Sequence, residues 1–176
     1  APTDENTDQW LEAAASMGAK YAVFVTNHVT GFSMWPTGEN DYSMAGSPYR
    51  DGRADIVKDF IASCKKYGIK PGLYYSTGCN GYYGINDSKK MDYRSAEYQE
   101  YVRMVERQLA EIWGNYGELF EIWSHNLLFS AAIILDFLAL HGPQHDSLRE
   151  VLPPQTRTRI SGWRLRPAWG QSTRCS

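Results

Sequence analysis

The sequence predicts an α/β fold in which helices and strands alternate around a parallel sheet. Three short, nearly continuous apolar runs are typical of strands buried within such a sheet. An amphipathic segment with helix-capping signals precedes each run. No hairpin turn separates successive strands, so right-handed crossovers through the helices would place the strands parallel. A doubly wound sheet and a closed barrel both fit this alternation, but no glycine-rich loop supports a nucleotide-binding version.

The first predicted pair is a helix and a strand near the N-terminus. Thr7 can cap a helix that continues to Met17, and Gly18 supplies its stop. Residues 21–25 follow as a nearly continuous apolar run, which predicts a strand buried on both faces. A long loop rich in Gly, Pro, Asn and Asp then extends over residues 28–52.

The second pair begins with a helix that ends at Gly68. Residues 69–76 then predict a strand, with Pro71 and Gly72 weakening its start. The apolar positions of the helix share one face, which we expect to lie in the core: Ile56, Val57, Phe60, Ile61 and Cys64.

The third pair begins at Ser95, which can cap a long helix. A short strand over residues 119–123 follows the helix. The predicted buried stripe of this helix has helical spacing: Tyr98, Val102, Val105, Leu109 and Ile112.

The composition is that of an ordinary globular protein, with 43% hydrophobic and 22% charged residues. The aromatic content of 14% fits either a well-packed core or flat faces that stack on sugar rings. A net charge of −2 and the lack of a basic stripe in the first two thirds argue against nucleic acid as a partner. Three cysteines, Cys64, Cys79 and Cys175, provide neither a disulfide framework nor a CxxC metal pair.

No segment is expected to span a membrane. The longest apolar stretch covers residues 127–140, which is 14 residues, whereas a bilayer needs about 20. The polar, acidic opening APTDENTDQW contains no signal peptide. We expect either a cytoplasmic protein or one whose N-terminal part has been removed.

The composition changes abruptly after Trp123. Residues 1–123 hold all 12 tyrosines with 12 basic and 17 acidic residues, whereas residues 124–176 hold six arginines, no lysine and three acids. The change falls inside a predicted strand, although natural domain boundaries usually fall in polar linkers. We therefore expect a divergent tail over residues 124–176, irregular and partly helical. A shifted reading frame or a retained intron would explain it better than a basic binding tail.

Candidate functional residues stand where the predicted strands end, since reacting groups lie there in such folds. The first strand leads into His28, the second ends with Tyr74 and Tyr75, and the third ends at Trp123. Adjacent tyrosines on a strand point to opposite sides, so only one can face a ligand. An imidazole, a phenol hydroxyl and an indole face together suit a ligand with hydroxyls and an apolar face. Each residue taken alone is more often structural.

Three stretches of sequence resemble one enzyme family in their order and spacing. They are DQWLEAAASMGAKYAVFVTNHVTGFSMWPT with the following Asp41-Tyr42-Ser43, RADIVKDFIASCKKYGIKPGLYYS, and YGELFEIW. They are similar to segments of the glycoside hydrolase family 29 α-L-fucosidases, and together they cover residues 8–123. The resemblance implies a partial (β/α)8 TIM barrel of about three βα units, with residues 1–123 as a partial catalytic barrel.

The resemblance also implies an activity and a set of site residues. Members of this family are exo-acting, retaining glycosidases that release L-fucose from glycoconjugates and need no metal or organic cofactor. By position, substrate contacts fall on His28, Trp35 and Tyr74. The implied partner is a fucosylated glycan or glycoside. Relatives are often secreted or lysosomal, and the resemblance fixes neither a compartment nor an oligomeric state for this chain.

Three positions depart from the family pattern. Val29 replaces the second histidine of a pair, and Thr30 replaces the aspartate after it. The family nucleophile, an aspartate, would stand at the position of His125. Histidine cannot form the hydrolysable glycosyl ester of a retaining mechanism, so no catalytic residue is expected to be retained. Other carboxylates are more simply solvated or at strand edges: Asp41, Glu118 and Glu121.

We therefore predict an α-L-fucosidase-type glycoside hydrolase that lacks its nucleophile and is inactive as a 176-residue chain. One alternative is a non-catalytic relative that binds fucose or a similar sugar. Another is a truncated product without a stable function, because three strands cannot close an eight-stranded barrel.

Overall fold

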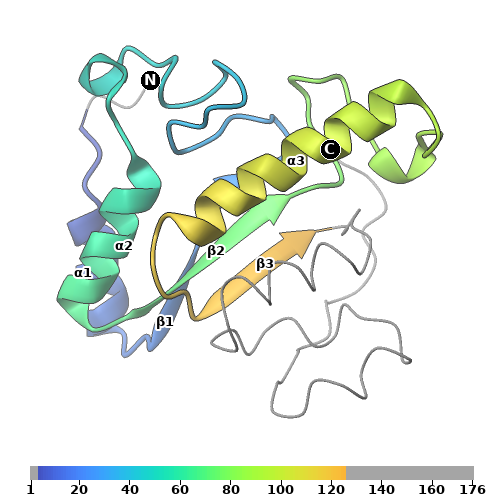
Figure 1. Cartoon of the computed structure of the whole chain (residues 1–176). Helices are drawn as coiled ribbons and strands as arrows, with labels where there is room; N and C mark the ends of the chain where they lie inside the picture. The colour runs from blue at the N-terminus through green and yellow to red at the C-terminus, as the bar shows by residue number, and fades with distance from the viewer. Residues whose placement is uncertain (1–3, 126–176) are drawn as a thin grey trace, which may run out of the picture.

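The computed structural model describes residues 4–125, so nearly all of the predicted tail lies outside the described part. Within these residues, helices and strands alternate in the predicted order (Figure 1). In chain order the elements are α1 (Thr7–Ser16), β1 (Tyr21–Asn27), the 3-10 turn η1 (Tyr49–Gly52), α2 (Ile56–Tyr67), β2 (Lys70–Ser76), the 3-10 turn η2 (Ser88–Lys90), α3 (Ala96–Gly114) and β3 (Glu121–His125).

The three strands form one parallel sheet with β2 in the middle. Tyr21 of β1 pairs with Lys70 of β2, and Gly72 of β2 pairs with Glu121 of β3. The strands therefore lie in the sheet in the same order as in the chain. The α/β class and the parallel sheet are confirmed. A partial TIM barrel stays a prediction, because closure needs strands beyond these three.

Helix α1 begins at Thr7, one residue earlier than expected, because Thr7 was predicted to be the residue that caps it. The Asn6 side chain accepts a hydrogen bond from the backbone N–H of Gln9 at 3.2 Å, so Asn6 is the N-cap, and the prediction of Thr7 is wrong. Thr7 is instead the first helical residue, and its buried hydroxyl donates to Ser63 Oγ at 2.7 Å. Gly18 follows the helix with a φ of +80°, which is the left-handed stop that the sequence predicts.

Helix α2 ends at Gly68 as predicted, and its start, for which no cap was predicted, is capped by Asp55. The Asp55 side chain caps it by accepting from the backbone N–H of Lys58 at 2.9 Å, and Gly68 closes it with a φ of +67°. Most of its predicted apolar face is buried: Ile56, Val57, Phe60 and Cys64. Cys64 is a core residue, as predicted, and burial raises the pKa of its thiol to about 12.

Helix α3 is capped by Ser95 as predicted, but its buried stripe is rotated from the predicted one. Tyr98 and Val102 lie at the margin and are only half-buried. The centre includes Gln108, whose Oε1 accepts from the Tyr75 hydroxyl on β2. An apolar pattern cannot reveal a buried glutamine, which explains the error. The observed stripe is Tyr101, Met104, Val105, Gln108, Leu109, Ile112 and Trp113.

Strand β1 is not buried on both faces, contrary to the prediction. Tyr21 is 50% exposed and Val25 is 45% exposed. The physical reason is that β1 lies at an edge of the described sheet and that the helices cover one face only. Strand β3 also differs, since it begins at Glu121 and continues to His125 rather than covering residues 119–123.

The main hydrophobic core lies between the helices and one face of the sheet. Leu73 and Tyr75 of β2 and Ile122 of β3 belong to this core together with apolar residues of all three helices. Figure 1 shows α3 lying along β2. Because strand side chains alternate, Gly72 and Tyr74 point to the opposite face, away from the helices.

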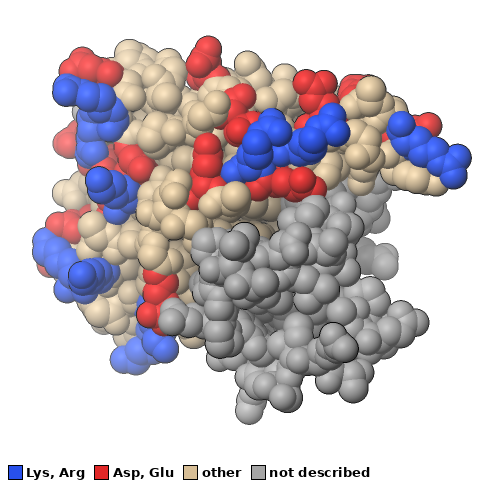
Figure 2. All heavy atoms as spheres, viewed as in Figure 1, with Lys and Arg blue, Asp and Glu red and all other residues tan. Residues whose placement is uncertain are grey.

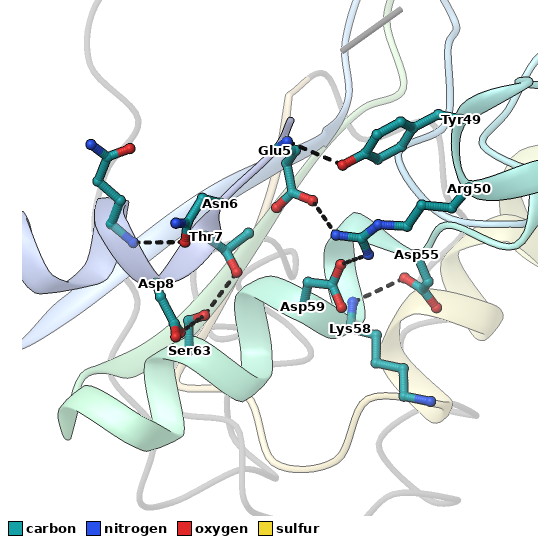
Figure 3. Close-up of polar contacts among 11 residues, drawn as sticks. Glu5, Asn6, Thr7, Asp8, Tyr49, Arg50, Asp55, Lys58, Asp59 and Ser63 are labelled. Atoms are coloured by element: carbon teal, nitrogen blue, oxygen red, sulfur yellow. Dashed lines mark hydrogen bonds and ion pairs between the residues drawn. The ribbon is translucent and has the colours of Figure 1, made fainter. Parts of the chain in front are cut away.

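A polar network joins the start of α1, turn η1 and α2 (Figure 3). Arg50 forms ion pairs with Glu5 at 3.2 Å and with Asp59, and the Tyr49 hydroxyl accepts from the Glu5 backbone N–H at 3.1 Å. Arg50 and Asp51 have φ values of 49° and 56°, in the left-handed region that non-glycine residues rarely adopt. The ion pairs of Arg50 help to hold this strained turn.

Candidate functional site

Three aromatic side chains meet at the carboxyl end of the sheet, on the face away from the helices. The ring centroids of His28 and Tyr74 are 5.7 Å apart, and those of Tyr74 and Trp123 are 5.6 Å apart with the rings nearly perpendicular. Two of these residues, His28 and Tyr74, are predicted substrate contacts. The third, Trp123, is the indole that the sequence predicts at the end of the third strand, as a candidate partner of these two in binding a ligand.

A β-bulge in β1 sets the direction of His28. Val25 pairs with Tyr74, but Asn27 pairs with the very next residue of β2, so Thr26 is an extra residue. The Thr26 hydroxyl donates to the Tyr74 carbonyl oxygen at 2.8 Å. Because side chains alternate along a strand, the extra residue moves His28 from the helix-covered face to the face of Tyr74. No local sequence signal marks this bulge.

The cluster combines a protected phenol with two accessible rings. Burial raises the pKa of Tyr74, and a hydrogen bond with the Ser76 side chain offsets only part of that rise. The Tyr74 hydroxyl therefore stays protonated at neutral pH and can donate to a ligand. Trp123 is 49% exposed, and His28 is also exposed, so both can reach a bound molecule.

A tight turn follows β1 and holds His28 in place. The backbone N–H of Gly31 donates to the His28 carbonyl at 2.9 Å, and Asn27 Nδ2 donates to the Gly31 carbonyl at 3.1 Å. Gly31 has a φ of +83°, and a Cβ atom there would lie 2.0 Å from Asn80 Oδ1. Only glycine fits both the conformation and the space.

Val29 and Thr30, the turn residues expected to depart from the family pattern, bind the loop after β2. The Val29 carbonyl accepts from the Gly81 N–H at 2.7 Å, and the Thr30 carbonyl accepts from the Tyr82 N–H at 3.2 Å. These contacts use the backbone, so the loop connection does not depend on which side chains stand at positions 29 and 30. Their side chains supply no imidazole or carboxylate to a sugar.

Trp35 lies apart from the aromatic cluster. Its indole is buried in the core, 6.3 Å from the Tyr75 ring, and its Nε1 donates to Glu111 Oε2 at 2.8 Å. Tyr75 points to the helix-covered side of β2, whereas Tyr74 points to the other side. The structure thus does not bring Trp35 next to His28, and its role as a substrate contact stays a prediction.

The position predicted for the nucleophile lies at the end of β3. The backbone of His125 pairs with that of Ser76, at the same end of the sheet as the aromatic cluster. Of the other carboxylates considered, Asp41 and Glu118 are exposed, and Glu121 stands at the opposite end of β3.

The described residues offer no metal centre and no membrane span. Within residues 4–125, no group of three or more His, Cys, Asp or Glu side chains could hold a metal ion. No helix in that range is both long and apolar enough to cross a bilayer. On the face drawn in Figure 2, acidic and basic side chains are interspersed over the described residues.

Comparison with known proteins agrees with the resemblance seen in the sequence. A family model described as α-L-fucosidase matches residues 1–131. The α-L-fucosidase 1 of Arabidopsis thaliana is 32% identical over 123 residues, which are 69% of this chain and 22% of that protein. The chain thus spans about a fifth of the length of this curated relative.

Solved structures show the same fold. A fucosidase-like protein of Bacteroides thetaiotaomicron has 34% identity and a TM-score of 0.72, over 82% of this chain and 34% of that one. A family 29 α-L-fucosidase from the same organism, trapped as a covalent intermediate, has 26% identity and a TM-score of 0.59, over 70% of this chain and 28% of that one. With the family model matching most of its length, the chain belongs to the α-L-fucosidase family, glycoside hydrolase family 29.

Proposed function

We propose that His28, Tyr74 and Trp123 hold the L-fucosyl residue of a fucosylated glycan or glycoside in an exo-acting, retaining α-L-fucosidase. The observation that supports the proposal is the cluster of His28, Tyr74 and Trp123. It stands at the carboxyl ends of three parallel strands, and the enzymes built on parallel α/β barrels place their reacting groups at that end.

The chemistry of the cluster suits L-fucose. This sugar is a 6-deoxyhexose, so it combines several hydroxyls with a methyl group and an apolar ring face. His28 and the protonated Tyr74 hydroxyl supply hydrogen bonds, and the exposed Trp123 ring supplies an apolar surface.

We further propose that the 176-residue chain does not hydrolyse fucosides by itself. In the trapped relative, a covalent intermediate forms with 2-fluoro-fucosyl fluoride, which supports the retaining route for this family. That route needs a carboxylate nucleophile and a second carboxyl about 5–5.5 Å away. In this chain, the position assigned to the nucleophile is His125, and imidazole does not give a hydrolysable glycosyl ester.

Titration with L-fucose tests the binding role. Trp fluorescence and saturation-transfer NMR would report binding at Trp123, and we expect His28→Ala to weaken affinity about fivefold or more through the lost hydrogen bond. The control is Tyr21→Ala, which changes an exposed tyrosine at the other end of β1. Equal affinity in the native chain and in His28→Ala would contradict the proposed site.

An activity assay tests the proposed lack of hydrolysis. We expect no release of the phenol from an aryl α-L-fucoside. Turnover by the purified chain would show that another group replaces the missing nucleophile. Absence of any fucose binding would instead favour the truncated, non-functional product, and tight binding without turnover would favour the non-catalytic relative.

A further inference from the structure

We propose that Gln108, a buried residue of α3, is a positioning residue of the candidate site and sets the spacing between His28 and Tyr74. The inference rests on the proposed function, because it takes His28 and Tyr74 to be groups that hold the sugar. Gln108 lies on the helix-covered side of the sheet, so it acts through other residues rather than on the sugar itself.

Gln108 is the centre of a buried polar cluster. It is 1% exposed, and its Oε1 accepts from the Tyr75 hydroxyl at 2.5 Å. Its Nε2 donates to the hydroxyl oxygens of Ser33 at 3.3 Å and of Thr37 at 3.4 Å. A buried amide without partners costs free energy, whereas both ends of this one are bonded. A polar group that is fully bonded in a core favours one arrangement of its neighbours.

One arm of the cluster leads to Tyr74. The hydrogen bond from Tyr75 to Gln108 fixes the Tyr75 ring against α3. Tyr75 directly follows Tyr74 in β2, and side chains alternate along a strand, so the two rings point to opposite faces of the sheet. A shift of Tyr75 relative to α3 therefore moves the backbone that carries Tyr74.

The other arm leads to His28. Ser33 is fully buried, and its hydroxyl oxygen, which has two lone pairs, also accepts from Asn27 Nδ2 at 3.4 Å. The same Nδ2 donates to the Gly31 carbonyl at 3.1 Å, within the turn that begins at His28. Asn27 directly precedes His28 in the chain. The position of its side chain therefore helps to set the direction in which His28 leaves β1.

The two arms meet in the sheet itself. Asn27 and Tyr75 are paired in the ladder between β1 and β2, and both side chains join the cluster of Gln108. Their chain neighbours, His28 and Tyr74, meet on the other face with ring centroids 5.7 Å apart. A single carboxamide on α3 thus holds the two residues directly behind the site.

A purely structural role of Gln108 would affect stability alone, and Tyr116 provides the matched comparison. The Tyr116 hydroxyl donates to Asp55 Oδ2 at 2.8 Å, so it joins the end of α3 to the start of α2 and leads to no residue of the site. Tyr116→Phe removes this hydrogen bond and keeps the shape of the side chain. We expect it to lower the free energy of unfolding in urea and to leave His28 and the affinity for L-fucose unchanged.

Fucose titration and NMR of the His28 imidazole test the inference. Gln108→Met keeps the length of the side chain and removes both of its hydrogen-bonding ends. We expect the His28 resonance to shift, because the ring current of Tyr74 depends on the spacing of the two rings. The affinity for L-fucose should fall about fivefold. The spectrum of His28→Ala identifies the resonance.

Ser33→Ala keeps the inference testable if Gln108→Met does not fold. It removes the hydroxyl that joins Gln108 to Asn27, leaves the Tyr75 bond in place, and should shift the His28 resonance as well. An unchanged resonance and unchanged fucose affinity in these variants would overturn the inference and leave the proposed function intact. A shifted resonance in a chain that does not bind fucose would overturn the proposed function and keep the positioning role. An unchanged resonance without fucose binding would overturn both.

Discussion

Thr26 shows how a single residue can decide the chemistry of a site. Its backbone is the extra residue of the β1 bulge, and its buried hydroxyl donates to the Tyr74 carbonyl at 2.8 Å. We predict that Thr26→Val destabilises the fold by about 1 kcal/mol. Valine has nearly the same shape as threonine, but it cannot donate a hydrogen bond to the buried Tyr74 carbonyl. Urea unfolding measures the loss. Thr30→Val, at an exposed threonine in the turn that follows β1, should have little effect. Equal stability of both variants would exclude this role for the Thr26 hydroxyl.

Cys64 gives a chemical test of the core at the same scale. It is fully buried, and desolvation raises the pKa of its thiol to about 12. The reactive species toward iodoacetamide is the thiolate, so we predict negligible alkylation of Cys64 at pH 7.5 in the folded chain and rapid alkylation in denaturant. Peptide mass spectrometry separates Cys64 from the other cysteines. Similar rates in both conditions would mean that α2 does not pack as described.

The candidate site could be predicted from the sequence only in part. His28 and Tyr74 stand at strand ends, so their position followed from alternation and from the family resemblance. Their orientation could not be predicted, because the bulge at Thr26 moves the side chains after it to the opposite face of the sheet, and no sequence signal marks the bulge. The strand pattern alone left open whether Tyr74 or Tyr75 faces a ligand, and only the family resemblance selected Tyr74. The Tyr75 hydroxyl bonds to Gln108, which lies 33 residues away.

At the scale of elements, the contact between α1 and α2 depends on ionised Asp8 (Figure 3). Its carboxylate accepts from Ser63 Oγ at 2.6 Å and pairs with Lys66, and these hydrogen bonds hold the pKa of Asp8 below its ordinary value of 3.8. A lowered pKa stabilises the fold above pH 3.8, and the contribution disappears as the pH falls through the folded-state pKa.

Asp8→Asn tests this pH dependence. We predict that the variant is slightly less stable than the native chain at pH 7 and that the difference shrinks as the pH falls below 3.8, because the native chain then progressively loses the charge of Asp8. Denaturant unfolding over a series of pH values from 7 downward measures it. Glu12→Gln, on an exposed position of the same helix, is the control and should show no such trend. A difference that persists at low pH would assign the effect to packing rather than charge.

The elements themselves were largely predictable, for local reasons. Asp55, Ser95 and Gly68 are cap residues whose roles follow from their own side chains or backbone freedom. The errors came from tertiary context. The rotated stripe of α3 depends on a glutamine that is buried only because Tyr75 reaches it. The exposure of Val25 depends on which face of the sheet the helices cover. The sequence of β1 does not reveal this, because both faces of the strand carry apolar side chains.

At the scale of the whole molecule, the sheet has two different faces. One face packs against the helices, and the other carries Val25, Tyr74 and Trp123 with substantial exposure at two of the three. The strand β1 is apolar on both faces although the helices cover only one of them. A closed barrel would explain this, because the inner side chains of a barrel pack against those of other strands. This supports the expected barrel and explains why β1 resembles a fully buried strand in sequence.

His125→Asp tests whether restoring one residue can restore the chemistry. A retaining mechanism needs two carboxyls about 5–5.5 Å apart, and among the described residues Asp41 and Glu118 are exposed on loops while Glu121 begins β3 at the far end. We therefore predict that His125→Asp releases no L-fucose from α-L-fucosyl-D-galactose, whose leaving group needs protonation. His125→Asn is the matched control without a carboxylate, and fucose binding by both variants would confirm that they are folded. Steady turnover by His125→Asp alone would show that a second carboxyl already stands in the site.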